Sequence, residues 1–298
     1  MKIAISGTIN RDKVITWEGI SYESLGGLMY SILTAAVLAP EGATIYPIAN
    51  VGYDIFEEVD ELLSGYGNID LSGLERSDSP NNVVYLHINE ENERDEFTEL
   101  NLPPVDYTQI EPYLDADALL LNMTSGFEFD ESLIREINLL RQGTLYLDVH
   151  SLTLGIDERG HRFRRKIPHP LNWLQGVDFV QLTADEAFSF HRGKVFTIES
   201  ATSVAQWIGE IVDNTCLMTM GERGVLAHSG DDIFFKKAEE VEIIEDTTGC
   251  GDVFGMSFLI EYLSSGNLRK AVEYGIQKSA IKCGFTGIEE MRRLALEV

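Results

Sequence analysis

The strongest chemical signal in the sequence is a glycine-flanked stretch, EDTTGCGDVFG, at positions 245–255. An apolar run at 241–244, which we expect to be a strand, precedes it, and an apolar helical pattern follows. A glycine turn at a helix start leaves backbone N–H groups that, with the helix dipole, suit an anion. A carboxylate beside that anion, at Asp252, can accept a proton from a hydroxyl that attacks phosphorus. The pattern fits phosphoryl transfer, and an aspartate that caps the helix explains it equally well.

Positions 246–252, DTTGCGD, resemble the DTxGAGD signature of the ribokinase (PfkB) family of carbohydrate and nucleoside kinases, with Cys250 where alanine is commonest. A chance match at five fixed positions is rare, on the order of one in a few thousand at average residue usage. The resemblance implies that Asp252 is the general base. It also implies that the N–H groups of Gly249, Cys250 and Gly251 stabilise the transferring phosphoryl group.

Substrate contacts are implied nearer the N-terminus. The stretch GTINRD at 7–12 resembles the family's opening GxxNxD, whose Asn and Asp bind substrate hydroxyls, here Asn10 and Asp12. Gly26 and Gly27 resemble the di-glycine that packs against the substrate, and Ser31 stands where the family has a further substrate-binding asparagine. Independently of the family, Asp12 follows a strand-like run, and α/β proteins bind ligands where strands end. An aspartate that caps a turn is the alternative.

Nucleotide contacts are implied in the C-terminal half. The stretch TMGERG at 219–224 resembles the T-x-G-x-x-G loop that lies along the nucleotide phosphates, although a plain hairpin turn explains its glycines as well. Residues 278–287 fall where the family's last helix and loop border the adenine. The nucleotide-binding residues implied in this way are Thr219, Gly221, Gly224, Thr247, Lys278 and Gly284.

The resemblance also implies metal ions. The family's N-x-x-E, which organises Mg²⁺ through water, reads TADE here, so that Glu186 is present and Thr183 replaces the asparagine. An acid favourable to a helix dipole is the alternative interpretation of Glu186. Asp246 and Thr248 match positions at which many relatives bind a monovalent cation such as K⁺.

The elements that must position these residues follow an α/β order. Short apolar runs alternate with amphipathic stretches, which predicts a mainly parallel sheet with helices on both faces. Two segments, at 13–23 and 82–100, instead predict antiparallel hairpins, with turns near Gly19 and at 90–94. The resemblance implies a ribokinase-like three-layer α/β/α sandwich, a single domain over 1–298 in which 12–25 and 82–100 form a small β lid.

One basic cluster interrupts the acidic sequence: residues 159–166, RGHRFRRK, carry five Lys or Arg residues. They follow a predicted strand whose end faces the ligand crevice. A solvated loop that pairs with acidic neighbours is one interpretation. The other is that Arg162, Arg164 or Arg165 meets a substrate or product phosphate through its guanidinium group.

Composition excludes several classes of protein. The 298 residues carry a net charge of −26, which argues against general binding to nucleic acid or to anionic membranes. No apolar run approaches a membrane span. Three widely spaced cysteines predict neither a disulfide framework nor a metal site, and favour a reducing compartment, the cytoplasm. The sequence lacks the GxxxxGK[ST] motif of P-loop NTPases, and it lacks the GxGxxG after the first strand that a nicotinamide-dinucleotide site would need.

We therefore expect an ATP-dependent kinase that uses Mg²⁺ to phosphorylate a hydroxyl of a sugar or nucleoside. The alternative is a non-catalytic nucleotide- or sugar-binding protein that keeps the fold, an interpretation that the replaced asparagines at Ser31 and Thr183 favour. Exposed lid edges invite pairing into a homodimer. The sequence does not distinguish one sugar or nucleoside from another.

Overall fold

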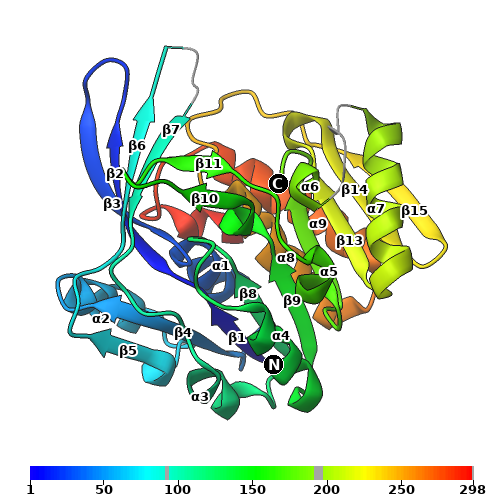
Figure 1. The fold of residues 1–298 in the computed structure, drawn as a ribbon, viewed down its shortest axis with the longest axis horizontal. Coiled ribbons are helices and arrows are strands. Elements are labelled where there is room, and N and C mark those ends of the chain that lie inside the picture. Colours follow the sequence, from blue (N-terminus) through cyan, green and yellow to red (C-terminus); the bar gives the residue numbers. More distant parts are fainter. Residues whose placement is uncertain (91–93, 191–196, 297–298) are drawn as a thin grey trace.

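The computed structural model describes residues 1–90, 94–190 and 197–296. Its main feature is a nine-stranded sheet with the order β15-β14-β13-β12-β9-β8-β1-β4-β5 (Figure 1). Neighbouring strands from β13 to β5 run parallel, and only β14 and β15 at one edge are antiparallel. The mainly parallel sheet predicted from the sequence is therefore confirmed. The strands are β1 (Lys2–Ser6), β4 (Thr44–Gly52), β5 (Leu74–Ser77), β8 (Ala118–Asn122), β9 (Thr144–Asp148), β12 (Phe179–Thr183), β13 (Thr215–Thr219), β14 (Gly224–Ser229) and β15 (Asp232–Lys237).

Helices cover both faces of this sheet, which gives the three layers that the α/β pattern predicts. In β1, Ile3 and Ile5 belong to one apolar cluster, with residues of α1, α8 and α9, whereas Ala4 belongs to another, with α4 and α7. Alternate side chains of one buried strand thus pack on opposite layers. The helices are α1 (Met29–Leu38), α2 (Phe56–Ser64), α3 (Tyr107–Ile110), α4 (Glu131–Leu140), α5 (Pro170–Leu174), α6 (Ala187–Phe190), α7 (Ile198–Val212), α8 (Cys250–Ser265) and α9 (Leu268–Cys283).

A second, four-stranded sheet projects from one corner of the molecule (Figure 1). It consists of β3 (Ser21–Gly27), β2 (Ile9–Ile15), β6 (Val83–Ile88) and β7 (Arg94–Glu99). Hairpins β2–β3 and β6–β7 are antiparallel, as predicted, and β2 runs parallel to β6. Gly19 lies in the first turn, where its N–H donates to the Thr16 carbonyl oxygen at 2.9 Å. The second predicted turn, at 90–94, lies largely outside the described residues.

Two predicted elements differ from the structure. The run at 241–244 is an irregular segment rather than a strand, and Ile243 and Ile244 are 68% and 61% exposed. Apolar β-branched residues favour a strand, but no described strand pairs with them. The amphipathic pattern at 184–191 predicts a helix, but α6 begins only at Ala187, and the last residue of that pattern lies outside the described residues.

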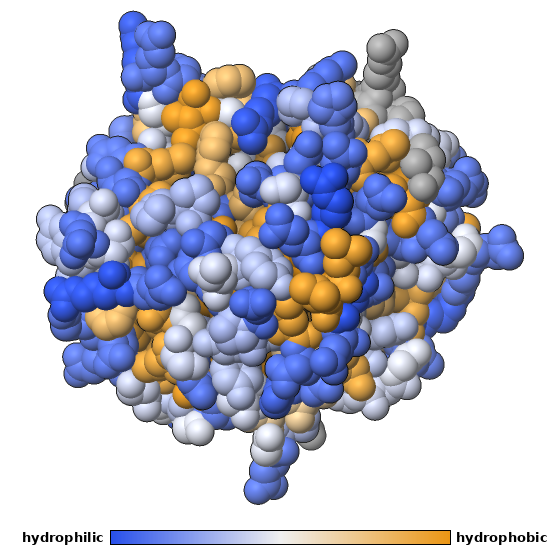
Figure 2. All heavy atoms as spheres, turned by 60° about the horizontal axis from the view of Figure 1, so that its bottom comes forward, coloured by the Kyte–Doolittle hydropathy of each residue, from blue (hydrophilic) through white to orange (hydrophobic). Residues whose placement is uncertain are grey.

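The surface agrees with the composition. On the face drawn in Figure 2, hydrophilic residues predominate and apolar residues form small groups between them. Among the described helices, none has both the length and the apolar character that crossing a bilayer requires.

Candidate active site

The glycine-flanked turn forms the N-terminus of α8. Gly249 precedes the helix with φ +80°, and a Cβ atom there would overlap the ring of Tyr30. Only glycine combines this backbone conformation with this close packing. The Cys250 N–H donates to the Thr247 carbonyl oxygen at 3.3 Å, so this predicted anion-hole donor already has a partner within the turn. Gly251 is exposed. The first turn of a 16-residue helix therefore opens outward, as an anion site requires.

Asp252 lies in that first turn and is buried. Its Oδ1 accepts a hydrogen bond from Asn122 Nδ2 at 2.6 Å, and the same nitrogen lies 3.4 Å from Ser31 Oγ. Burial raises the pKa of Asp252, while His150, Asn122 and Ser31 act in the opposite direction. Ser31, implied as a substrate contact, thus lies beside the candidate base. A buried carboxylate with a raised pKa is suited to accept a proton near neutral pH.

Three polar side chains follow one another across the ends of adjacent strands. Asn122 pairs in register with Asp148, and Asp148 pairs with Gln181. Gln181 Nε2 donates to Asp148 Oδ2 at 3.1 Å and to the Gly251 carbonyl oxygen at 3.0 Å. Tyr146 Oη donates to Gln181 Oε1 at 2.6 Å. This network ties the carboxyl edge of the sheet to the first turn of α8, the edge where α/β sheets bind ligands.

A cluster of titratable groups surrounds Asp252. Burial raises the pKa of Asp148 well above its ordinary value, and burial likewise raises the pKa of Glu186. Burial lowers the pKa of His150, but the nearby carboxylates of Asp252, Asp148 and Glu186 outweigh that effect, so the pKa of His150 is raised. These groups share one low-dielectric region, where strongly shifted pKa values are typical of active sites.

Glu186 follows β12 and forms a reciprocal pair with Thr183. The Thr183 N–H donates to Glu186 Oε2 at 2.7 Å, and the Glu186 N–H donates to Thr183 Oγ1 at 3.1 Å. No described group of three or more His, Cys, Asp or Glu residues could hold a metal ion. Because Mg²⁺ in kinases is held largely by phosphates and water, a single carboxylate at this edge fits that ion without a protein cage.

The residues implied as substrate contacts meet at the base of the small sheet. Asn10 is paired in register with Gly26, and Asp12 with Ser24. A Cβ atom on Gly26 would overlap the Asp12 carboxylate, and one on Gly27, at φ +60°, would overlap the Thr8 carbonyl oxygen. Asn10 Oδ1 is buried and has no hydrogen-bond partner among the described residues. Such an acceptor suits a ligand hydroxyl, because an unsatisfied buried polar atom is costly.

The implied nucleotide contacts are more dispersed. Thr219 ends β13, and Gly221 (φ +57°) and Gly224 (φ +127°) bound the short turn that leads into β14. Lys278 Nζ donates to the Leu296 carbonyl oxygen at 3.1 Å and lies 5.3 Å from the centroid of the Tyr274 ring. Its ammonium is therefore already hydrogen-bonded to the C-terminal segment. Gly284 directly follows α9. A nucleotide-binding role for these residues stays a prediction.

The basic cluster forms part of a two-stranded ribbon, β10 (Leu154–Ile156) and β11 (Arg162–Arg164). Arg162 Nε donates to Glu96 Oε1 at 3.1 Å and to Thr98 Oγ1 at 3.0 Å, both on β7. Arg164 Nη1 donates to Thr153 Oγ1 at 2.6 Å. The cluster therefore fastens the ribbon to the small sheet and to the segment after β9, and Arg162 pairs with an acidic neighbour, Glu96, as the first interpretation predicts.

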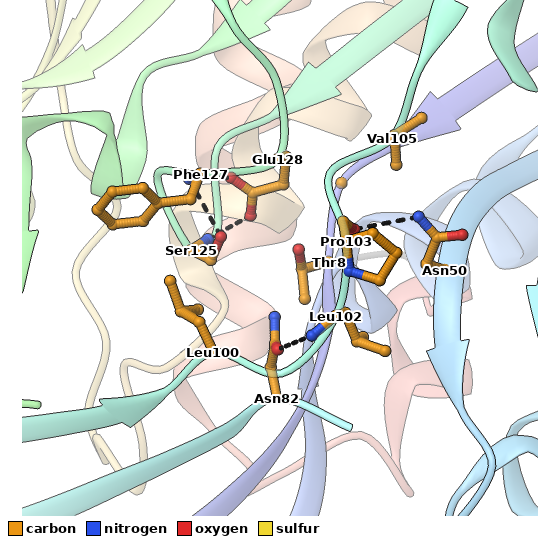
Figure 3. Close-up of a pocket in the computed structure, with 11 residues that line it drawn as sticks. Thr8, Asn50, Asn82, Leu100, Leu102, Pro103, Val105, Ser125, Phe127 and Glu128 are labelled. Carbon is orange, nitrogen blue, oxygen red and sulfur yellow. Dashed lines mark hydrogen bonds between the residues drawn. The ribbon is translucent and has the colours of Figure 1, made fainter. Parts of the chain in front are cut away.

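Two cavities are lined by residues other than those predicted for the site. One, of about 20 Å³, has room for about one water molecule. Figure 3 shows part of its wall, where Ser125, Phe127 and Glu128 lie close together. The Glu128 carboxylate accepts hydrogen bonds from the N–H groups of Gly126 at 2.8 Å and Phe127 at 3.0 Å. The other, of about 530 Å³, is lined by Arg141, Asp178 and residues at the amino ends of strands. Asp252 lines neither cavity.

Several site residues escaped the sequence analysis, namely Asn122, Gln181, Tyr146 and Lys282. Asn122 and Gln181 are polar residues in otherwise apolar strands, which is a usable signal because a buried polar group needs a partner. Asp148 ends the buried strand β9, and His150 lies in the turn that follows it. The cysteines at 250 and 283 are distant in sequence, yet their sulfur atoms lie 3.4 Å apart.

The chain is similar to known proteins in sequence and in fold. The pfkB family carbohydrate kinase model matches residues 154–291. An ATP-dependent 6-phosphofructokinase of Thermoanaerobacterium thermosaccharolyticum is 25% identical over 130 residues, which span 44% of this chain and 38% of that relative's length.

Two solved structures match over almost the whole chain. A ribokinase of Arabidopsis thaliana, complexed with ribose and ATP, has a TM-score of 0.78 at 14% identity, covering 98% of this chain and 96% of its own. A pyrophosphate-dependent kinase in the ribokinase family, complexed with a pyrophosphate analog and myo-inositol, has a TM-score of 0.80 at 16% identity, covering 99% of each chain. At sequence identities this low, the structural similarity establishes the fold alone. The fold is ribokinase-like, and together with the family match it supports a protein of the ribokinase/PfkB family.

Proposed function

We propose that this protein is a kinase that transfers the γ-phosphate of ATP to a hydroxyl of a sugar or nucleoside. The observation that carries the proposal is the placement of Asp252. Its carboxylate is buried in the first turn of α8, directly after a left-handed glycine, and Asn122 holds it at 2.6 Å. A helix cap alone would not need a carboxylate fixed from a distant strand.

The substrate site would lie between the base of the small sheet and α8. Asn10 Oδ1, which is buried without a partner among the described residues, would accept from one substrate hydroxyl. The Asp12 carboxylate would accept from another. Gly26 and Gly27 let the sugar approach the backbone, because side chains there would overlap Asp12 and Thr8. These contacts orient one remaining hydroxyl toward Asp252, and positioning of this kind supplies much of the rate in phosphoryl transfer.

In the transfer step, the substrate oxygen forms a bond to the γ-phosphorus while the bond from that phosphorus to the bridging β–γ oxygen breaks. The hydroxyl proton passes to the Asp252 carboxylate. The N-terminal turn of α8, around Gly249 and Gly251, faces the transferring phosphoryl group and stabilises its charge. The small sheet acts as a lid that excludes water, which would otherwise hydrolyse the donor.

Bound Mg²⁺ would neutralise charge on the β- and γ-phosphate oxygens. Glu186 would hold it through water, because the carboxylate lies at the same sheet edge as Asp148 and Asp252. ATP is the donor that the name of the Thermoanaerobacterium relative gives and that the Arabidopsis ribokinase structure contains. Pyrophosphate, the donor of another similar structure, belongs in the test.

The small sheet also offers a surface for a second copy of the chain. Trp17 and Ile20, in the hairpin turn between β2 and β3, are 58% and 56% exposed. We infer a homodimer that pairs through this sheet. Light scattering after size exclusion should give twice the 33.3 kDa chain mass, and Trp17→Ser with Ile20→Ser should return the monomer.

The decisive experiment combines ATP or pyrophosphate with Mg²⁺ and a panel of sugars and nucleosides, with product detected by phosphorus NMR. We expect turnover of at least one acceptor, and a loss of about 10²–10⁴-fold in kcat for Asp252→Asn. Asp60→Asn, an exposed residue of α2, is the matched control. Turnover that survives Asp252→Asn would refute the mechanism. Thermal shifts by ligands without any turnover would favour the non-catalytic binding protein.

A further inference from the structure

Lys282, in the last turn of α9, is the most unusual charged residue in the described part of the chain. Its relative exposure is 0%, and it is among the largest fully buried side chains. Lysine is almost never fully buried unless its ammonium is paired. A function for this ammonium must therefore be sought in what surrounds it.

Four groups surround the Lys282 ammonium. Its Nζ donates to the Phe285 carbonyl oxygen at 2.9 Å and lies 3.9 Å from Asp246 Oδ2. The ring centroids of Phe285 and Tyr30 lie 4.8 Å and 5.6 Å from the same nitrogen. A carboxylate, a carbonyl oxygen and two aromatic faces form a cation site whose occupant is part of the chain.

This site is joined to the phosphate-binding turn at three points. Asp246 Oδ1 accepts from the Thr248 N–H at 2.8 Å, so the carboxylate that faces Lys282 also shapes the turn. The Glu245 N–H donates to the Cys283 carbonyl oxygen at 2.8 Å, which fastens the start of the turn to the end of α9. The Tyr30 ring fills the space beside Gly249. Displacement of the ammonium would disturb each of these contacts.

The same contacts decide whether a free monovalent cation fits. The resemblance assigns such an ion to Asp246 and Thr248. The Asp246 carboxylate, however, already accepts a hydrogen bond from the Thr248 N–H through Oδ1 and pairs with the Lys282 ammonium through Oδ2. A second positive ion at that carboxylate would meet the charge of Lys282 in a buried environment, where like charges repel strongly. The residues present therefore do not fit K⁺.

We propose that Lys282 is a positioning residue that replaces a monovalent cation: its ammonium neutralises Asp246 and holds the turn at 245–249 in the shape that binds phosphate. The kinetic part of this proposal rests on the proposed kinase function. Without the ammonium, the Asp246 carboxylate would stand uncompensated beside an anion site and would oppose phosphate binding.

The first test uses the unaltered protein. Catalytic rate and melting temperature are measured in potassium chloride and in choline chloride at equal ionic strength. We expect both to agree within about twofold in rate and within error in melting temperature. A saturable activation or stabilisation by K⁺ would overturn the proposal, because it would show that a free cation still binds.

The second test empties the site. Lys282→Ala leaves Asp246 and the Phe285 carbonyl oxygen facing a cavity. We expect a rise of about tenfold or more in the KM for the phosphoryl donor, and recovery of both KM and melting temperature with K⁺ or ammonium ions. Lys270→Ala, which removes an exposed lysine from the same helix, should show neither effect. Wild-type donor affinity in Lys282→Ala, without added cation, would refute the positioning role.

A double variant covers the case in which Lys282→Ala does not fold. Lys282→Met with Asp246→Asn removes both charges and keeps the volume, and it should fold yet bind the donor more weakly and not respond to K⁺. Unimpaired donor binding in this variant would contradict the proposal. Failure of the kinase function itself is distinguishable, because the melting-temperature responses to K⁺ and ammonium do not need turnover.

Discussion

Asn122 donates a hydrogen bond to the Asp252 carboxylate at 2.6 Å, although 130 positions separate the two residues in the chain. Asn122 ends a central strand and Asp252 lies in the first turn of a helix, so this contact fixes the candidate base relative to the sheet. Asn122 Oδ1 is buried without a partner among the described residues, and therefore stays available to a ligand or to water.

Asn122→Leu should lower kcat by about ten- to a hundredfold, because a hydrogen bond to a charged group contributes about 1.5–3 kcal/mol. The bond from Asn122 opposes the burial that raises the pKa of Asp252. Its loss should therefore move the acid limb of the pH–rate profile to higher pH. Steady-state rates across pH measure both effects, and the surface variant Asn172→Leu is the control. An unshifted acid limb would show that Asn122 does not act through Asp252.

Asp148→Asn should stabilise the protein at alkaline pH. Burial raises the pKa of Asp148 in the folded state, so the folded protein binds the proton of the Asp148 carboxyl group more tightly than the unfolded chain does. Stability is therefore lost as pH rises from the unfolded value, about 3.9, through the folded value. The amide removes this penalty and can still accept from Gln181.

Thermal unfolding at about pH 4 and about pH 8 tests this sign. The variant should melt higher than the wild type at the alkaline pH, by about 2–4 °C for each kcal/mol gained, and the difference should shrink at the acidic pH. A variant that is less stable at both pH values would mean that the hydrogen bond with Gln181 outweighs the burial of charge.

Gly249→Ala should impair donor binding as well as stability. The added Cβ would overlap the Tyr30 ring and would also strain a backbone at φ +80°. Gly266→Ala separates these effects, because Gly266 ends the same helix at φ +64° in open space. Both variants should lose about 1 kcal/mol to backbone strain, whereas only Gly249→Ala should raise the KM for the donor. Equal kinetics in the two variants would argue against a shaped anion site.

The sequence was sufficient to predict elements that have a periodic apolar pattern. The buried strands of the large sheet and the hairpin β2–β3 agree with the pattern, because apolar runs and Gly19 act locally. It was insufficient for β5, whose residues LERS have no apolar pattern and pair with β4 at the sheet edge. The strand predicted at 241–244 is wrong for the same reason. A strand forms only where a neighbouring strand pairs with it, and the apolar pattern does not show whether such a neighbour exists.

The residues of the candidate site also fall into two groups, those that the sequence could predict and those that it could not. Asp252 and its glycines lie in one short segment, so their spacing was informative. Lys282 shows in the sequence only as a basic residue near a helix end, and its charge partner Asp246 lies 36 positions earlier. Contacts of this kind depend on which strands and helices become neighbours. They could be assigned only once the register and the helix packing were known.

Oxidation should join Cys250 to Cys283 and inactivate the proposed kinase. The two sulfur atoms lie 3.4 Å apart, and a hydrogen bond with Cys250 lowers the pKa of the Cys283 thiol to about 7. The lowered pKa favours the thiolate of Cys283, and the thiolate is the reactive form. Diamide would accept the two electrons and two protons released as the disulfide forms. Because Cys250 is the first residue of α8, drawing its sulfur into a covalent bond would displace the turn at 245–249, which we propose to bind phosphate.

We expect diamide to reduce the free thiols from three to one, to abolish donor binding, and to act reversibly upon addition of dithiothreitol. Cys283→Ser should keep its activity under the same treatment, and Cys216→Ser, which alters a buried cysteine in β13, should remain sensitive. Inactivation of Cys283→Ser by diamide would show that the effect arises elsewhere. An oxidised protein that still binds the donor would show that the turn tolerates the bond, and that the anion site does not depend on the position of Cys250.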